Sequence, residues 1–167
     1  MDYKSKIILI SGPTASGKSK IAINLAKKIN GEIINADSMQ VYKQLKILTA
    51  RPSGEDQKNI KHHLFGIIDV RKRFSTGQWL KECIKIINLI RKKKKIPIIV
   101  GGTGLYFKAL VDGLVSIPKF KPSEKNKILK LHKKLGQKQF YKKLVKIDPV
   151  SKKFINSNDV NLSLIHI

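Results

Sequence analysis

Residues 7–19 read Ile-Ile-Leu-Ile-Ser-Gly-Pro-Thr-Ala-Ser-Gly-Lys-Ser, an apolar run that passes into a glycine-rich loop. Apolar residues then recur at helical spacing from Ile21 to Ile29, which predicts an amphipathic helix. A strand that turns through such a loop into a helix directs backbone N–H groups and the positive helix end at one point, where a di- or triphosphate binds well. The order of strand, loop and helix distinguishes this pattern from an ordinary glycine-rich turn.

Two residues of this loop have distinct expected roles at a bound diphosphate. The Lys18 ammonium is expected to contact the outer phosphates, and the Ser19 hydroxyl is expected to be a ligand of Mg²⁺. The residues predicted to bind a diphosphate or nucleotide are Gly12, Pro13, Thr14, Ala15, Ser16, Gly17, Lys18 and Ser19. The loop by itself fits an ATP-dependent small-molecule kinase as well as other phosphate chemistry.

The first two thirds of the chain alternate between short apolar runs and helical patterns. The runs are rich in isoleucine and valine, as buried parallel strands tend to be, and they cover residues 6–11, 32–36, 64–69 and 96–101. From Thr76 to about Lys93, one helical stripe carries Trp79, Cys83, Ile87 and Ile90, which predicts core packing. We therefore predict an α/β core over residues 1–113, a P-loop-type parallel sheet with helices on both faces.

The composition changes after Gly113. Residues 114–167 contain thirteen lysines and no arginine against three acidic residues. Their apolar residues suggest short amphipathic helices, with breaks at Gly136 and at Asp148-Pro149. We predict a lysine-rich, all-helical domain attached to the core.

The whole chain is strongly basic. Its 167 residues include 35 basic and 11 acidic ones, for a net charge of +24, and such an excess attracts nucleic acid. Nearly all of the basic residues are lysine, so part of the excess could instead reflect a compositional bias.

The sequence also bounds the compartment. A single cysteine, Cys83, excludes an intramolecular disulfide and a cysteine-based zinc site. No apolar stretch approaches the ~20 residues that span a bilayer, and the first strand follows Met1-Asp2-Tyr3-Lys4 too closely for a signal peptide. We expect a cytoplasmic monomer without a membrane partner.

Three loops should meet at the carboxyl edge of the sheet, where open parallel sheets bind ligands. Besides the phosphate loop, these are residues 35–38 and residues 101–104. Asp37 could accept a proton from a nucleophile or hold Mg²⁺ through water, or it could cap a turn. The Thr103 hydroxyl, between glycines, is a candidate hydrogen-bond donor, or this segment is simply a tight turn.

His62 and His63 are a weaker signal. Adjacent side chains point to different sides of an extended chain, so a shared metal is not expected. We predict a core or supporting role for one of the two histidines.

Six motifs of this chain occur together, in the same order, in one enzyme family. They are Gly12-Pro-Thr-Ala-Ser-Gly-Lys-Ser19, Asn35-Ala-Asp-Ser-Met-Gln-Val-Tyr42, Thr49-Ala-Arg-Pro52, His62-His-Leu64, Gly101-Gly-Thr-Gly-Leu-Tyr106 and Asp148-Pro149. With these motifs the chain resembles the tRNA dimethylallyltransferase, or tRNA isopentenyltransferase, family. The resemblance implies a P-loop-type core and an inserted helical domain that grips the anticodon arm of tRNA.

The same resemblance implies a reaction, in which a dimethylallyl group passes from dimethylallyl diphosphate to N6 of the adenine 3′-adjacent to the anticodon. In it Thr14 to Ser19 hold the diphosphate with Mg²⁺, and Asp37 matches the general base. The catalytic set implied is Asp37, Lys18 and Thr103. The implied tRNA contacts are Asp37, Ser38, Met39, Gln40, Thr103 and Lys125, the last at a position where we expect arginine more often in the family.

The chain also departs from the family. Members are longer, so the resemblance covers only their first half, and after Asn158-Asp159 they continue with a Gln-Arg pair where this chain has residues 160–167. We therefore expect a truncated helical domain. Two alternatives remain: a P-loop kinase that uses ATP on a small metabolite, and an inactive basic RNA-binding remnant. A kinase has no need of the motifs around Asp37 and Thr103.

Overall fold

The computed structural model describes residues 6–114 and 122–166. The chain divides into two compact units, Met1–Val115 and Ser116–Ile167. Within the described residues, no helix is both long enough and apolar enough to cross a membrane.

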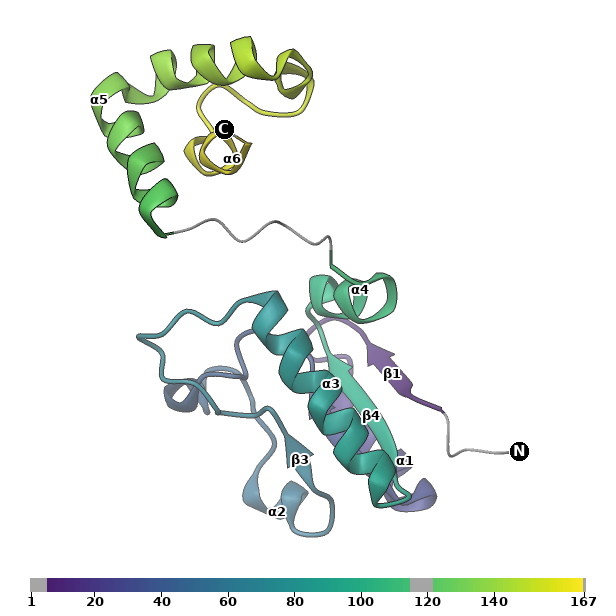
Figure 1. The fold of residues 1–167 in the computed structure, drawn as a ribbon. Coiled ribbons are helices and arrows are strands. Elements are labelled where there is room, and N and C mark those ends of the chain that lie inside the picture. Colours follow the sequence, from purple (N-terminus) through teal and green to yellow (C-terminus); the bar gives the residue numbers. More distant parts are fainter. Residues whose placement is uncertain (1–5, 115–121, 167) are drawn as a thin grey trace. The chain divides into compact units, whose positions relative to one another are not determined.

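The first unit is built on a four-stranded sheet with the order β1-β4-β2-β3 (Figure 1). All neighbouring strands run parallel. The strands are β1 Ile8–Ser11, β2 Gly31–Asn35, β3 His62–His63 and β4 Ile96–Gly101. In the centre, Ile98 of β4 pairs with Ile8 on one side and with Ile33 on the other. The parallel sheet predicted from the apolar runs is confirmed.

Three longer helices and two short ones accompany these strands. They are α1 Lys18–Ile29, the 3₁₀ turn η2 Lys43–Leu45, α2 Gly54–Gln57, α3 Thr76–Lys92 and α4 Gly104–Asp112. Helix α3 begins with a capping box: Ser75 Oγ accepts the Gln78 N–H at 3.2 Å, and Gln78 Oε1 accepts the Ser75 N–H at 2.8 Å. Both otherwise unpaired donors of the first turn are thereby satisfied.

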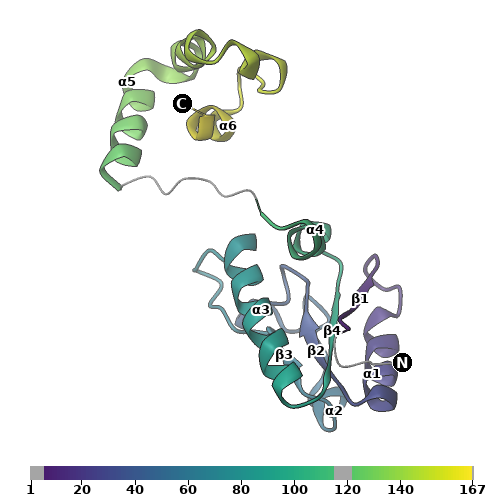
Figure 2. The same cartoon turned by 45° about the vertical axis from the view of Figure 1, so that its right-hand side comes forward.

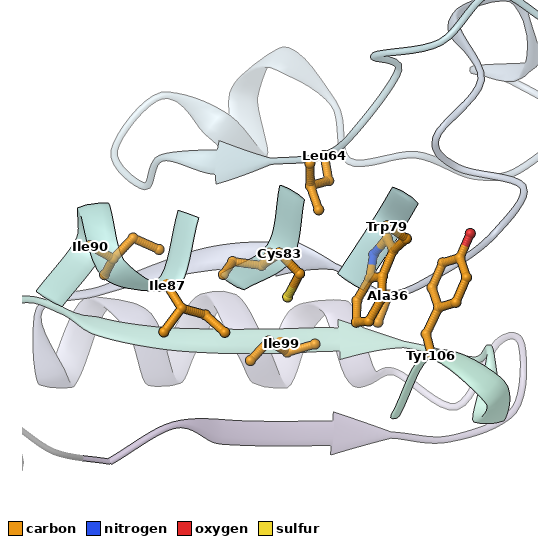
Figure 3. Close-up of a cluster of buried hydrophobic side chains, with 9 residues drawn as sticks. Ala36, Leu64, Trp79, Cys83, Ile87, Ile90, Ile99 and Tyr106 are labelled. Carbon is orange, nitrogen blue, oxygen red and sulfur yellow. The ribbon is translucent and has the colours of Figure 1, made fainter. Parts of the chain in front are cut away.

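Helices cover both faces of the sheet because its strands send successive side chains to opposite sides. Ile33 and Ile98 pack with Ala22 and Ala26 of α1. The next residues, Ile34 and Ile99, pack under α3 and α4 among Trp79, Cys83, Ile87, Ile90 and Tyr106 (Figure 3). Figure 2 shows α1 and α3 on opposite sides of the sheet. The predicted layers and the predicted apolar stripe of α3 are thus confirmed.

The third strand lies at a different position in the structure from the one predicted. The expected strand at 64–69 is wrong, because β3 is His62–His63 and ends just before that segment. Leu64 and Gly66 take positive φ angles of 63° and 59°, which break an extended backbone. Ile68 forms an isolated parallel bridge to Tyr42, outside the four strands of the sheet. Apolar composition marked the segment correctly as partly buried but not as a strand.

The second unit consists of α5 Pro122–Ile147, the 3₁₀ turn η3 Pro149–Lys153 and α6 Val160–His166. Gly136, with φ 72° and ψ 164°, divides α5 into two helical parts, and α5 ends before Asp148-Pro149, as predicted. Phe140 and Leu144 are fully buried. The side chain of Gln137 ties the unit together by donating to Ser157 O at 2.7 Å and to Ser163 Oγ at 3.1 Å.

Candidate active site at the carboxyl edge of the sheet

The phosphate loop connects β1 to α1 in a tightly wound conformation. Gly17 has φ 77° and Ala15 has φ 64°, so the chain turns sharply just before the first helical residue, Lys18. The Lys18 ammonium folds back and donates to the Pro13 carbonyl at 2.7 Å. At the start of the loop, the Gly12 N–H reaches the Gly101 carbonyl at 3.4 Å. The loop is therefore anchored to the end of the neighbouring strand β4.

The second loop is organised by Asn35, which is fully buried at the end of β2. Asn35 Oδ1 accepts the Asp37 N–H at 2.9 Å, while Asn35 Nδ2 donates to Asp37 O at 2.9 Å and to Leu64 O at 3.2 Å. On the far side of the sheet, the Trp79 indole N–H donates to the Asn35 carbonyl at 2.8 Å. This network fixes the backbone that carries Asp37.

The Asp37 carboxylate closes the turn that follows it. Its Oδ1 accepts the N–H groups of Met39 at 2.9 Å and of Gln40 at 3.3 Å. The turn-forming alternative from the sequence is therefore present in the structure. It is compatible with chemistry at Asp37, since the bonds to Met39 and Gln40 share one carboxylate oxygen and the side chain is only half-buried.

The third loop, after β4, is linked to the second one through Thr103. Thr103 Oγ1 accepts the Ser38 N–H at 2.9 Å and donates to Ser38 Oγ at 3.3 Å. The Thr103 N–H donates to the Ala36 carbonyl at 3.1 Å. The Thr103 hydroxyl thus bridges two loops instead of capping α4, for which no side-chain cap is formed.

The first two loops enclose a cavity of about 620 Å³. The lining includes Thr14 to Ser19 of the phosphate loop together with Asp37, Met39 and Gln40. Lys18 and Asp37 therefore face one shared space. Among the described residues, the lining does not include Gly12, Pro13, Ser38 or Thr103, which support the loops from outside the cavity.

The opposite wall of the cavity was not predicted as part of the site. It is formed by residues 48–50, Pro52, His62 and Phe65. Gln40 holds this wall in place, because its Nε2 donates to the Thr49 carbonyl at 2.9 Å. The motif Thr49-Ala-Arg-Pro52 was the available signal, but its residues have no chemistry that marks them as ligand-binding.

Arg51 of that motif points away from the cavity and braces the wall. Its guanidinium donates to the carbonyls of Tyr42 at 3.3 Å and Lys43 at 3.4 Å. It also lies where a Cβ on Gly66 would stand, and the positive φ of 59° at Gly66 favours glycine at that position. The hydrogen bonds of Gln40 and Arg51 therefore link the wall to the segment that follows Asp37.

His62 and His63 separate as expected from an extended chain. His62 lines the cavity, whereas His63 Nε2 contacts buried Glu32 Oε2 at 2.7 Å. His63 therefore has the predicted supporting role. In the described part of the chain, no group of three or more His, Cys, Asp or Glu residues could hold a metal ion.

Lys125 belongs to α5 in the second unit, and its side chain lies outside the described residues. The remaining predicted site residues all belong to the first unit. Their assigned roles stay predictions, although the cavity brings the phosphate loop and Asp37 together.

Comparison with known proteins places these features in a family. Residues 40–162 match the family model described as IPP transferase. The chain belongs to the IPP transferase family. The match covers both units and includes the Asp37 loop from Gln40 onward.

Curated members of the IPP transferase family are similar along almost the whole chain. A tRNA dimethylallyltransferase of Pelagibacter ubique is 63% identical over 164 residues, which cover 98% of this chain and 52% of that protein. A tRNA dimethylallyltransferase of Rhizobium rhizogenes is 43% identical over 152 residues, 91% of this chain and 51% of that protein. The chain thus spans about half the length of these relatives.

Solved structures of IPP transferases share the fold. A eukaryotic dimethylallyltransferase acting on tRNA superimposes with a TM-score of 0.81 at 34% identity, over 95% of this chain and 39% of that one. The tRNA isopentenylpyrophosphate transferase of Bacillus halodurans gives a TM-score of 0.66 at 33% identity, over 95% and 53%. The P-loop-type α/β core predicted from the sequence is confirmed.

Proposed function

We propose that this chain carries the diphosphate-binding and base-accepting half of a tRNA dimethylallyltransferase. The reaction moves a dimethylallyl group from dimethylallyl diphosphate to N6 of the adenine 3′-adjacent to the anticodon, in the cytoplasm. The observation that carries this proposal is the single cavity of about 620 Å³ that both Lys18 and Asp37 line. Family membership supports the transferase over a small-metabolite kinase.

The phosphate loop is suited to the leaving group of this reaction. Residues 14–19 line the cavity, and a diphosphate there meets the Lys18 ammonium and the N-terminal end of α1, which favours anions. Lys18 would exchange its bond to the Pro13 carbonyl for a charged partner. The negative charge that develops on the departing diphosphate is thereby stabilised.

Mg²⁺ fits the donor set on this side of the cavity. Mg²⁺ prefers oxygen ligands and is commonly held by few protein groups plus substrate phosphates and water. The Ser19 hydroxyl lines the cavity and would supply the protein ligand. When bound, Mg²⁺ supplies charge neutralisation for the leaving diphosphate.

Asp37 is placed to act as the general base. The adenine N6 amine forms a bond to the allylic carbon while the carbon–oxygen bond to the diphosphate breaks, and one N6 proton passes to the Asp37 carboxylate. Because Oδ1 already accepts the Met39 and Gln40 N–H groups, the second carboxylate oxygen is the acceptor. The adenine must leave its stack to reach this cavity.

Residues around Asp37 would hold the flipped adenine and the nearby tRNA. Met39 and Gln40 line the cavity and would contact the base. Ser38 and Thr103 support the loop through their mutual hydrogen bonds. Lys125, in the lysine-rich second unit, would contact the phosphates of the anticodon arm as a point charge. A monomeric enzyme suffices for this chemistry.

The test is to incubate the chain with radiolabelled dimethylallyl diphosphate, Mg²⁺ and unmodified tRNA. Label in the RNA supports the transferase. Phosphate transferred from ATP to a metabolite would establish the kinase alternative, and retention of tRNA without label would establish an RNA-binding remnant.

A matched pair of variants assigns the role of Asp37. Asp37→Asn keeps an oxygen that can accept the Met39 and Gln40 N–H groups but removes the base. We expect transfer to fall by at least about 100-fold while diphosphate affinity is retained. Asp112→Asn, an exposed carboxylate of α4, is the control and should behave as wild type.

A further inference from the structure

A second concave site lies at the opposite edge of the sheet, away from the phosphate loop. Its volume is about 650 Å³, and its lining consists of Lys27, Lys28, Ile29, Asn30, Arg91, Lys94, Lys95 and Ile96. These residues form the C-terminal ends of α1 and α3 and the start of β4. We refer to this group as the basic pocket. Because parallel strands share one direction, it lies at the end where strands begin.

The basic pocket concentrates positive charge without a carboxylate in its lining. Five of its eight lining residues are lysine or arginine, and none is acidic. Lys27, Lys28 and Lys94 are exposed, and among residues 6–114 and 122–166 none of these three takes part in an ion pair. Lys95 is ion-paired with Glu32, and the other four cations of the lining gather at two helix C-termini, where positive charge is favourable.

The backbone around the basic pocket is held in a defined conformation. Asn30, the C-cap of α1, and Lys94, two residues after the end of α3, have positive φ angles of 54° and 57°. The Ile96 N–H contacts the Asn30 carbonyl at 3.4 Å, which joins the two helix ends. The Lys95 ammonium is anchored to Glu32 Oε1 at 3.2 Å, and that Glu32 side chain is only 2% exposed. The backbone that carries the cations of the pocket is therefore held in one conformation.

The direction of the helices decides which anion fits. Small phosphates are bound by backbone N–H groups at helix N-termini, whereas α1 and α3 both present their C-terminal carbonyl ends here. Attraction must come from side-chain charge alone, and four of the five cations are lysines, which supply hydrated point charges and not a fixed fork. Such an arrangement suits an extended chain of phosphates contacted without regard to sequence.

We propose that the basic pocket binds the phosphodiester backbone of RNA, as a site separate from the cavity at the other edge of the sheet. It shares with the proposed function only the premise that the ligand is RNA. It does not require prenyl transfer to occur.

The first test compares two triple variants of the full chain by measuring tRNA affinity across a salt series. Lys27→Gln, Lys28→Gln and Lys94→Gln remove three pocket charges. Lys72→Gln, Lys81→Gln and Lys108→Gln remove three exposed charges elsewhere on the first unit. We expect the slope of log affinity against log salt to become shallower by about 2 in the pocket variant, with little change in the control. Equal slopes in both variants would overturn the proposal.

The second test locates the RNA directly. Lys28→Cys and Lys81→Cys each introduce one exposed thiol for a photocrosslinker, because burial raises the pKa of the Cys83 thiol to about 12 and keeps it unreactive. We expect tRNA to crosslink from position 28 and not from position 81. Unlabelled RNA should remove the crosslink, and tripolyphosphate at equal phosphate concentration should not. Equal competition by tripolyphosphate would assign the pocket to small anions and overturn the proposal.

The two tests separate this inference from the proposed function. Prenyl transfer with no crosslink at position 28 refutes the basic-pocket proposal alone. A crosslink without prenyl transfer refutes the transferase proposal alone.

Discussion

Asn35 holds the backbone of Asp37 from both sides, accepting its N–H and donating to its carbonyl, each at 2.9 Å. Asn35 is fully buried and is itself bonded through its carbonyl to the indole of Trp79 at 2.8 Å. The position of the candidate base therefore depends on a side chain that does not itself line the cavity. Buried amide networks of this kind are costly to interrupt, because each lost partner leaves another polar group unsatisfied.

Asn35→Ala should destabilise the first unit strongly. The change removes the partners of the Asp37 N–H and of the Asp37 and Leu64 carbonyls, and we expect a loss of about 3 kcal/mol in the free energy of unfolding. Urea denaturation measures it. Asn88→Ala, at an exposed position of α3, is the control and should change stability by less than about 0.5 kcal/mol. Equal effects would contradict the assigned network.

Gly101→Ala tests the close approach of two strands at the mouth of the site. A Cβ at position 101 would overlap the backbone of Ala36, so the β2 and β4 ends would have to separate. We expect at least about 3 kcal/mol of destabilisation or failure to fold. Gly104→Ala is the matched control, because a Cβ there meets nothing within 4 Å and alanine favours the helix that begins at this residue. Thermal melts of both variants measure this difference in stability. A Gly101→Ala protein as stable as the wild type would refute the predicted contact.

Stability should decline on acidification through the His63 and Glu32 pair. Burial lowers the pKa of His63 below its ordinary 6.5, so the unfolded chain takes up this proton first, and stability falls as pH drops below about 6.5. Burial alone raises the pKa of Glu32, but the His63 hydrogen bond and the Lys95 and Lys93 ammonium groups lower it on balance. The Glu32 contribution is thus present above pH 4.5 and lost as pH falls through the lowered folded value.

His63→Gln separates these two contributions. Glutamine can still donate to Glu32 but does not titrate, so the free energy of unfolding should be flatter between pH 5 and 6.5 than in the wild type. The decline at more acidic pH should remain, because Glu32 is still present. Chemical denaturation at a series of pH values provides the measurement. Identical profiles for the two proteins would exclude His63 as the titrating group.

Lys18→Ala should weaken diphosphate binding without affecting the fold. Lys18 is half-buried, and within residues 6–114 and 122–166 its ammonium donates to the Pro13 carbonyl, so its loss costs little stability. A hydrogen bond between charged groups contributes about 1.5–3 kcal/mol, which corresponds to about a 10- to 100-fold loss of affinity. Calorimetric titration with inorganic pyrophosphate and Mg²⁺ measures it, with Lys81→Ala as the control. Unchanged affinity would remove the phosphate-loop assignment.

Much of this architecture was predictable from local sequence. The phosphate loop, the strand at Ile96–Gly101 and the stripe on α3 each combine apolar periodicity with glycine or a cap, and both signals act over a few residues. The meeting of Lys18 and Asp37 followed from the rule that parallel strands gather their loops at one edge.

Other features depended on tertiary contacts that no local pattern records. The two-residue length of β3 results from left-handed backbone at Leu64 and Gly66, where Leu64 has no sequence preference for that conformation. The wall at residues 48–52 is placed by Gln40 and Arg51. The role of Asn35 as organiser depends on partners as far away as Trp79, and a lone buried asparagine gives no sign of such a network.

The placement of β4 between β1 and β2 has a consequence for synthesis on the ribosome. In the described sheet β1 is an edge strand whose neighbour is β4, so Ile8 waits for Ile98 to be made before it can pair. At about 5–20 residues per second, that interval is roughly 5–20 s. During this interval the apolar strand β1 has no partner strand in the nascent chain. Its unpaired edge can then mispair with other chains.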